Sequence, residues 1–219
     1  ITDWPPMSAE ALNNLLQVVG SGGIWEAGEI RSIDGVEGRD INDAGQVAGF
    51  KGGVAVVWDD GVITEVGLPE SDKSQAYGIN EAGQAVGRAR VLPRDTHPFF
   101  WDGSMSTDLG TLGGRDAVAN AINDLVQIVG GADTVSGESH AFLWEDGLMA
   151  DLNELLTQPF PYTLVEAVDI NNRGQIACLA VDSRGIDYAV LLNPIPEPGV
   201  LLLLTLGGAA AVLRRKGLV

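Results

Sequence analysis

The chain has 219 residues, and its 30 aspartates and glutamates outnumber its 13 lysines and arginines, which gives a formal net charge of −17 at pH 7. A body this acidic repels nucleic acid and anionic lipid, so neither is expected as a general partner. The single cysteine, Cys178, excludes an intramolecular disulfide.

A first sequence element recurs four times and predicts a β-hairpin. Each copy joins two apolar stretches through an Asn that is followed four residues later by Gln, and the copies span residues 40–49, 78–87, 121–130 and 169–178. Asn at the start of a type I turn can bond to the backbone, and a following Gly accepts a positive φ.

Gly45, Gly83 and Gly174 stand at the position of the turn that favours positive φ. Val126 takes this position in the third copy. We therefore expect the turn of the third copy either to differ from the others or to be strained.

A second element lies between the copies of the first and predicts two further strands. It contains Trp58, Trp101 and Trp144, each 43 residues from the next, followed by an acidic residue and Gly. The segment 188–192 resembles a last copy in which Leu192 takes the tryptophan position. Four short strands in about 43 residues predict an all-β fold of repeated four-stranded antiparallel units, β-propeller-like, with about four to five blades or a partial ring.

The N-terminal segment admits two alignments with these repeats. One places Leu12–Gly20 on Ile122–Gly130, and the other places Trp4 on Trp144. We prefer the second, because it leaves a normal repeat distance to Ile41.

Two groups of residues are candidates for metal binding, and we interpret both as structural. His97 and His140 occupy the same position in successive repeats, but a metal site needs three or four converging ligands. The segments that begin at Asp40 and Asp169 resemble calcium loops in part, but a turn explains them without an ion.

The tryptophans and the cysteine allow other interpretations. Trp58, Trp101 and Trp144 could stack on sugars, but a repeated tryptophan among aliphatic neighbours is more often part of a core. Cys178 is interpreted as a buried strand residue. Paired carboxylates for glycoside hydrolysis remain an open alternative, since the body is rich in acids.

The C-terminal segment predicts a membrane anchor. Residues 193–198 are rich in proline, residues 199–213 carry no charge, and Arg214, Arg215 and Lys216 follow. A helix of fifteen residues spans about 22 Å against roughly 30 Å of hydrocarbon, so the anchor would be short. The cations favour the cytoplasmic side. The alternative is a buried helix of the globular body, which rarely lacks any polar stripe.

Pro196-Glu197-Pro198, the apolar run and the basic end resemble the PEP-CTERM sorting signal of Gram-negative bacteria over residues 196–216. The resemblance implies that an exosortase, a membrane protease, removes the anchor and that the protein reaches the cell surface or the extracellular matrix. The implied sorting residues are Pro196, Glu197, Pro198, Arg214, Arg215 and Lys216. Export also requires a leader, and because none follows Ile1 we expect a signal peptide to precede this sequence.

A second resemblance concerns the repeats. The recurring His-x-Phe-x-Trp, the stretch 108–114 and the Ala-Ile-Asn-x-x-x-Gln-Ile-Val-Gly of the third copy resemble the HAF repeat of bacterial extracellular proteins. The likeness covers roughly residues 40–193 and is strongest over 97–145. It implies an extracellular location and a repeat architecture, and it implies no catalytic residues.

These patterns predict four regions: a β-repeat domain (1–193), a Pro-rich spacer with the PEP motif (194–198), a short transmembrane helix (199–213) and a basic cytoplasmic tail (214–219). Without residues 196–219, the body keeps a net charge of about −19. We expect a non-enzymatic binding or structural module for exopolysaccharide or envelope components, as in a biofilm. It would have no catalytic, metal or cofactor site, and its partners would be an exosortase-type protease and, transiently, the inner membrane. The alternative is a secreted carbohydrate-active enzyme on a small propeller.

Overall fold

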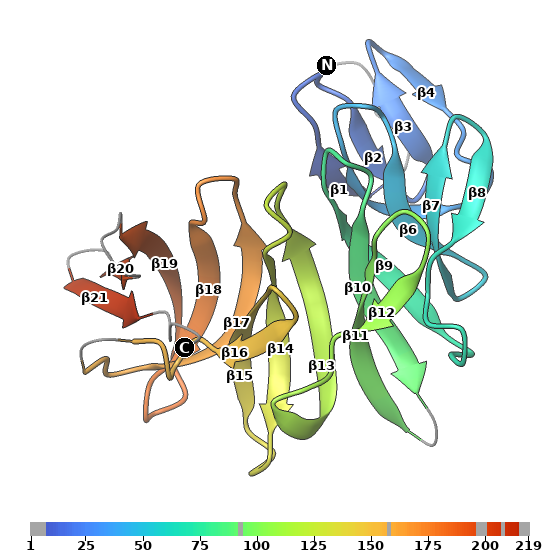
Figure 1. Cartoon of the computed structure of the whole chain (residues 1–219). Coiled ribbons are helices and arrows are strands. Elements are labelled where there is room, and N and C mark those ends of the chain that lie inside the picture. The colour runs from blue at the N-terminus through green and yellow to red at the C-terminus, as the bar shows by residue number, and fades with distance from the viewer. Residues whose placement is uncertain (1–7, 92–93, 157–158, 196–200, 207–208, 215–219) are drawn as a thin grey trace. The chain divides into compact units, whose positions relative to one another are not determined.

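The computed structural model describes residues 8–91, 94–156, 159–195, 201–206 and 209–214, with only the backbone described from residue 195 onward. All regular elements in these ranges are β-strands, so the predicted all-β class is confirmed. The chain divides into two compact units, Ile1–Asp108 and Leu109–Val219 (Figure 1).

The first unit contains three four-stranded antiparallel sheets in chain order. The first sheet has β1 (Ala9–Leu12), β2 (Val18–Gly20), β3 (Gly23–Glu26) and β4 (Glu29–Arg31). The second has β5 (Glu37–Ile41), β6 (Val47–Lys51), β7 (Val54–Asp59) and β8 (Val62–Glu65). The third has β9 (Ser74–Ile79), β10 (Ala85–Val91), β11 (Asp95–Trp101) and β12 (Ser106–Asp108).

The second unit contains the fourth and fifth sheets. The fourth has β13 (Gly113–Ile122), β14 (Ile128–Thr134), β15 (Ser139–Glu145) and β16 (Leu148–Asp151). The fifth has β17 (Thr163–Ile170), β18 (Ile176–Val181) and β19 (Asp187–Ile195), followed by β20 (Leu201–Leu206) and β21 (Ala209–Arg214). The predicted four-stranded antiparallel repeat is therefore present in both units, and its closure into a propeller ring stays a prediction.

Strand β20 and all but the last residue of β21 lie in the segment 199–213, for which the sequence predicts a helix. That prediction concerns the segment in a bilayer, where a spanning chain must satisfy its backbone groups internally, and it stays a prediction. The predicted domain boundaries likewise stay predictions. No helix among the described residues has the length and apolar character that crossing a membrane requires.

The N-terminal segment follows the alignment that we did not prefer. Val18 pairs with Trp25 as Val47 pairs with Trp58, so Leu12–Gly20 is the first copy of the Asn–Gln element. The competing alignment is therefore wrong for residues 12–20, and Trp4 itself lies outside the described residues. The β2–β3 loop is so short that Trp25 comes eight residues after Gln17, and this shortened spacing concealed the repeat.

Each sheet has two distinct faces, because successive side chains on a strand point to opposite sides. We call the front face the one that carries the cross-strand row ending in the tryptophan position, such as Ile41, Val47 and Trp58. The back face carries the residue just before that position, such as Ile24 in the first sheet and Val57 in the second. Within each unit, the front face of one sheet packs on the back face of the sheet before it.

Three apolar clusters show this packing. Ile24 shares a cluster with Ile41 and Trp58 at the junction of the first and second sheets. Val57 shares the next cluster with Ile79 and Phe99. In the second unit, Leu143 of the fourth sheet lies in one cluster with Ile170 and Leu192 of the fifth. The core therefore forms between sheets, and each sheet needs a neighbour to bury its apolar faces.

Candidate functional sites

The recurring Asn and Gln close the first hairpin of every sheet with the same set of bonds. The backbone N–H of Asn42 donates to the carbonyl of Gln46 at 3.1 Å, and the N–H of Gly45 donates back to the carbonyl of Asn42 at 3.0 Å. The Asn42 side chain accepts from the Gln46 N–H through Oδ1 at 3.0 Å and donates through Nδ2 to Gln46 Oε1 at 2.8 Å. We call this arrangement the Asn–Gln turn. It recurs at Asn13, Asn80, Asn123 and Asn171.

The fourth residue of the Asn–Gln turn has a positive φ in every sheet. Gly45 has a φ of 80°, whereas Val126 has 60° and Leu16 has 63°. The turn of the third copy therefore keeps the common geometry and is strained, because a side chain in this region is costly and a β-branched one most of all.

A second hydrogen bond of the asparagine side chain connects one Asn–Gln turn to the turn of the next sheet. Nδ2 of Asn13 donates to the carbonyl of Asn42 at 2.9 Å, and Nδ2 of Asn42 donates to the carbonyl of Asn80 at 3.0 Å. In the second unit, Asn123 donates in the same way to the carbonyl of Asn171 at 3.1 Å. We call this series the Asn ladder.

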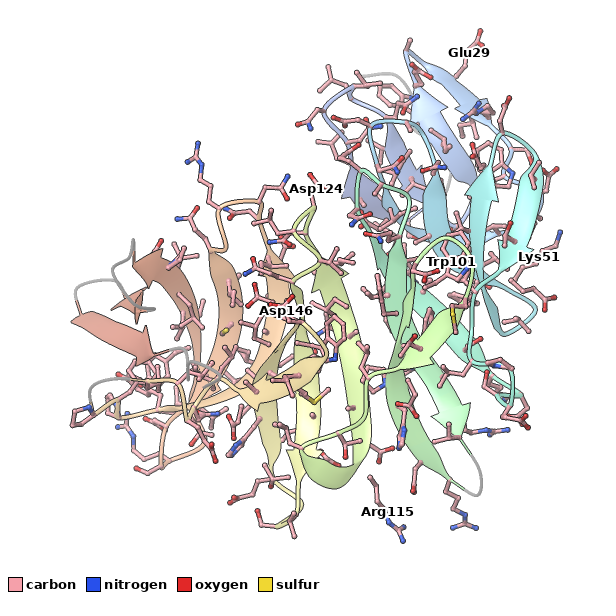
Figure 2. All side chains as sticks on the ribbon, viewed as in Figure 1. Glu29, Lys51, Trp101, Arg115, Asp124 and Asp146 are labelled. Carbon is pink, nitrogen blue, oxygen red and sulfur yellow. The ribbon has the colours of Figure 1, made fainter. Side chains whose placement is uncertain are left out.

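The residue after the asparagine adds a second contact between neighbouring turns. The backbone N–H of Asn14 donates to Asp43 Oδ1 at 2.9 Å, and that of Asp124 donates to Asn172 Oδ1 at 2.9 Å. Figure 2 shows Asp124 at the tip of the loop between β13 and β14. The segments that resemble calcium loops thus use their oxygens for turn and ladder bonds, and Asp40 Oδ2 itself accepts from the N–H of Ile79 at 2.9 Å.

The tryptophans differ in how far they are buried. Trp58 is buried, its Nε1–H donates to Asp34 Oδ2 at 3.2 Å, and the Arg31 guanidinium lies 4.8 Å from its ring centre. This burial places Trp58 in the core and leaves it no free face for a sugar. Trp101, on β11 (Figure 2), and Trp144 are half-buried.

Each histidine pairs with an aspartate eleven residues later. Nδ1 of His97 lies 2.7 Å from Asp108 Oδ2, and Nδ1 of His140 lies 2.5 Å from Asp151 Oδ2. Each pair joins two adjacent strands, β11 with β12 and β15 with β16. Within the described part of the chain, no three His, Cys, Asp or Glu side chains are grouped so as to hold a metal ion. The recurrence of Asp eleven residues after His was visible in the sequence and could have revealed these pairs.

Cys178 lies on β18 in the apolar cluster of the second unit and is 3% exposed. Burial raises the pKa of its thiol to about 12, because a thiolate would lose its hydration there. The thiol therefore stays protonated at neutral pH, as expected of a structural cysteine and not of a nucleophile.

A groove lined by carboxylates lies in the second unit. Its volume is about 240 Å³, and its walls come from β13, β14, β15 and β17. Three carboxylates line it, those of Asp116, Asp133 and Glu166. Ser139 donates to Asp133 Oδ1 at 3.1 Å, and Asn120 donates to Glu166 Oε1 at 2.9 Å. We call it the acidic groove.

Of the six predicted sorting residues, the structure describes Arg214 alone. Pro196, Glu197 and Pro198 lie outside the described residues, as do Arg215 and Lys216. Arg214 is the last residue of β21, with its backbone alone described.

Comparison with known proteins bears on this C-terminal segment. A family model described as the PEP-CTERM protein-sorting motif matches residues 194–216, which confirms the resemblance to that signal. No curated protein and no solved structure matches the chain. The match indicates a protein that is exported, held transiently in a membrane by its C-terminus, and processed by an exosortase, which is itself a membrane protein.

Proposed function

We propose that this chain is a repeat protein of the cell surface or extracellular matrix, released there after exosortase processing, and that it serves as a non-enzymatic binding or structural module for exopolysaccharide or other envelope components. The observation that carries the proposal is the sorting motif at residues 194–216, which follows directly on a strongly acidic body. A body of net charge about −19 stays soluble and does not adhere to anionic lipid once its anchor is removed.

The regularity of the sheets supports a structural role. The Asn–Gln turn and the front-face row recur in every described sheet, and the ladder bond recurs between neighbouring sheets within each unit. Repetition of this kind preserves packing and presents equivalent surfaces in series, whereas an enzyme concentrates its chemistry where the symmetry fails.

Replacement of Pro196, Glu197 and Pro198 by alanine tests the export route. In cells that contain an exosortase, we expect the variant to stay uncleaved and membrane-associated, while wild type appears outside the cell at a smaller size. Pro69→Ala, in an exposed loop of the first unit, removes a proline elsewhere and should be processed normally. A triple variant that is released at the normal mature size contradicts the proposal.

Sedimentation with isolated exopolysaccharide tests the second half of the proposal. Released wild-type protein should co-sediment with the polymer and should leave its chain length unchanged. Protein that remains in the supernatant at all polymer concentrations contradicts a polysaccharide-binding role.

The acidic groove is the observation that favours the second candidate, a secreted carbohydrate-active enzyme. Glycoside hydrolysis needs two carboxyl groups on either side of the scissile bond, roughly 5–10 Å apart. If the groove is such a site, released protein should generate reducing ends from a polysaccharide, and Glu166→Gln should abolish this activity while Glu138→Gln, on a nearby exposed turn, retains it.

A further inference from the structure

Three aromatic side chains gather in the second unit beside its apolar cluster. Phe160 and Tyr162 lie edge to face with their ring centres 5.2 Å apart, and Tyr162 lies tilted against Tyr188 at 4.5 Å. Phe160 and Tyr162 also pack on the apolar cluster. All three side chains are half-buried, so the core supports them while part of each remains in solvent. Rings held in this way form a firm apolar surface.

This aromatic group departs from the repeat in two ways. His97 and His140 each lie opposite an alanine of the neighbouring strand, and Tyr188 takes this place in the fifth sheet. The two other rings belong to the connection 152–162 between β16 and β17, which has eleven residues, whereas the equivalent connections before it have four to eight. A changed residue and a longer connection therefore meet in one place, and the packing of the repeat does not require either.

A hydrogen-bonded ion pair borders the aromatic group. Arg184 donates to Asp182 Oδ2 through Nε at 3.0 Å and through Nη2 at 2.7 Å, and the Tyr188 hydroxyl donates to the same oxygen at 3.3 Å. The Asp182 side chain is 9% exposed, whereas that of Arg184 is 70% exposed. A guanidinium has five N–H donors, so Arg184 keeps donors that face water. The pair adds hydrogen-bonding capacity beside the rings without adding net charge.

Two prolines restrict the connection that carries two of the rings. Pro159 and Pro161 flank Phe160 and are exposed. A proline fixes its own φ and limits the conformation of the residue before it. The segment that presents Phe160 and Tyr162 therefore has little conformational freedom to lose when a ligand binds, which favours binding.

We propose that Phe160, Tyr162, Tyr188, Asp182 and Arg184 form a binding platform for a neutral polysaccharide, which we call the aromatic platform. The assignment rests on the proposed function and names the class of polymer. The apolar C–H face of a pyranose ring can lie on an aromatic side chain, while its hydroxyl groups accept hydrogen bonds from the exposed guanidinium. All five residues belong to the second unit.

Charge and chemistry select the kind of polymer. The body has a net charge of about −19 and repels anionic polymers, and the pair of Arg184 with Asp182 offers no net positive charge to offset this repulsion. A neutral sugar therefore fits the platform better than an acidic one. Among its five residues Asp182 supplies the one carboxylate, whereas glycoside hydrolysis uses two, so the platform suits binding and not cleavage.

Fractionated exopolysaccharide tests the choice of polymer. Polymer isolated from cells that produce this protein is separated by anion exchange into a neutral and an anionic fraction, and each is sedimented with the full chain in a zwitterionic detergent, which carries no sugar. Wild type should bind the neutral fraction at least about tenfold more tightly. Equal or tighter binding of the anionic fraction overturns the neutral assignment while polysaccharide binding stands. Binding of neither fraction overturns both.

Variants test the place of binding. Tyr188→Ala removes one ring and should weaken binding of the neutral fraction about tenfold or more, and Arg184→Gln should weaken it about three- to tenfold. Tyr77→Ala, at a half-buried tyrosine of the first unit, and Arg173→Gln, at another exposed arginine, are the matched controls and should bind as wild type does.

Thermal melting shows whether each variant is folded. The Arg184 side chain is largely exposed, so Arg184→Gln should keep the fold even if Tyr188→Ala does not. Unchanged binding by folded Tyr188→Ala protein, or by Arg184→Gln protein if Tyr188→Ala fails to fold, overturns the aromatic platform. The proposed function would still stand in that case, because binding by wild type tests it separately.

Discussion

Nδ2 of Asn42 donates to the main-chain carbonyl of Asn80, 3.0 Å away, and so joins two sheets through a turn residue that is itself 2% exposed. The same side chain also closes its own turn through Gln46. One asparagine therefore determines both the shape of a hairpin and the position of the next sheet.

Asn42→Asp should destabilise the first unit by about 2–3 kcal/mol. The variant keeps an acceptor for the Gln46 N–H but cannot donate to the Asn80 carbonyl, and it buries a charge beside that oxygen. Asn171→Asp is the matched control, because Asn171 is exposed and, among the described residues, its Nδ2 donates within its own turn to Gln175; it should cost less than about 1 kcal/mol. Urea unfolding measures both. Equal losses would show that the bond between sheets contributes nothing beyond the turn.

Val126→Gly should stabilise the second unit by about 1 kcal/mol. Val126 has a φ of 60°, which glycine adopts without a steric penalty, and the relief exceeds the extra entropy of glycine in the unfolded chain. Gly45→Ala makes the reverse change at the same turn position and should cost about 1 kcal/mol. Its added Cβ would meet Arg31 Nη2 and Gln17 Oε1 at 3.7 Å, which is an ordinary contact, so the backbone strain is the main cost. Thermal melting checks both signs, and a destabilised Val126→Gly contradicts the strain argument.

Trp58→Ala should cost about 3–5 kcal/mol, because it empties a buried site between the first and second sheets. Trp101→Ala removes a half-buried ring and should cost about 1–2 kcal/mol. If Trp101 stacks on sugar, its variant loses exopolysaccharide binding with little change in melting temperature. A similar large loss of stability for both variants would place Trp101 in the core as well.

Cys178 should resist thiol reagents until the second unit unfolds. Its pKa of about 12 in the folded protein lies above the usual value near 8.5, so folding favours the protonated thiol. The sign follows: this contribution to stability is complete below about pH 8.5 and is lost as the pH rises toward 12. At pH 8, modification should be slow in buffer and fast in denaturant. Rapid labelling of folded protein contradicts the burial of this thiol.

Asp182 should contribute stability that acid removes. The backbone N–H of Ile186 donates a hydrogen bond to this carboxyl, and the Arg184 side chain and other donors add further bonds. These bonds lower the pKa of the carboxyl in the folded protein. Its contribution is therefore present above the unfolded pKa near 3.9 and is lost as the pH falls through the lower folded value. Asp182→Asn should show less loss of melting temperature than wild type between pH 5 and about pH 2. Identical pH profiles would contradict this assignment.

The sequence by itself determined the all-β class and the repeat of four strands, because alternation and turn residues are local patterns that each hairpin carries within itself. The sorting motif was equally visible, since its proline, apolar and basic parts follow one another without a break. The strained geometry at Val126 was one of two possibilities that the residue type allowed.

Only the tertiary structure decided which copies meet and how. Asn13 and Asn42 are 29 residues apart, and neither contains a signal for the bond between them, because that bond exists only once two sheets stack face to face. Because the β2–β3 loop is short, the spacing of the first repeat differs from that of the others, and the sequence alone did not reveal it. Only the strand pairing showed that Trp25 lies opposite Val18. Burial was decided at the same level: Leu12 and Ile41 occupy equal positions in two repeats, yet Ile41 is buried against Ile24 of the first sheet, whereas Leu12 is 60% exposed.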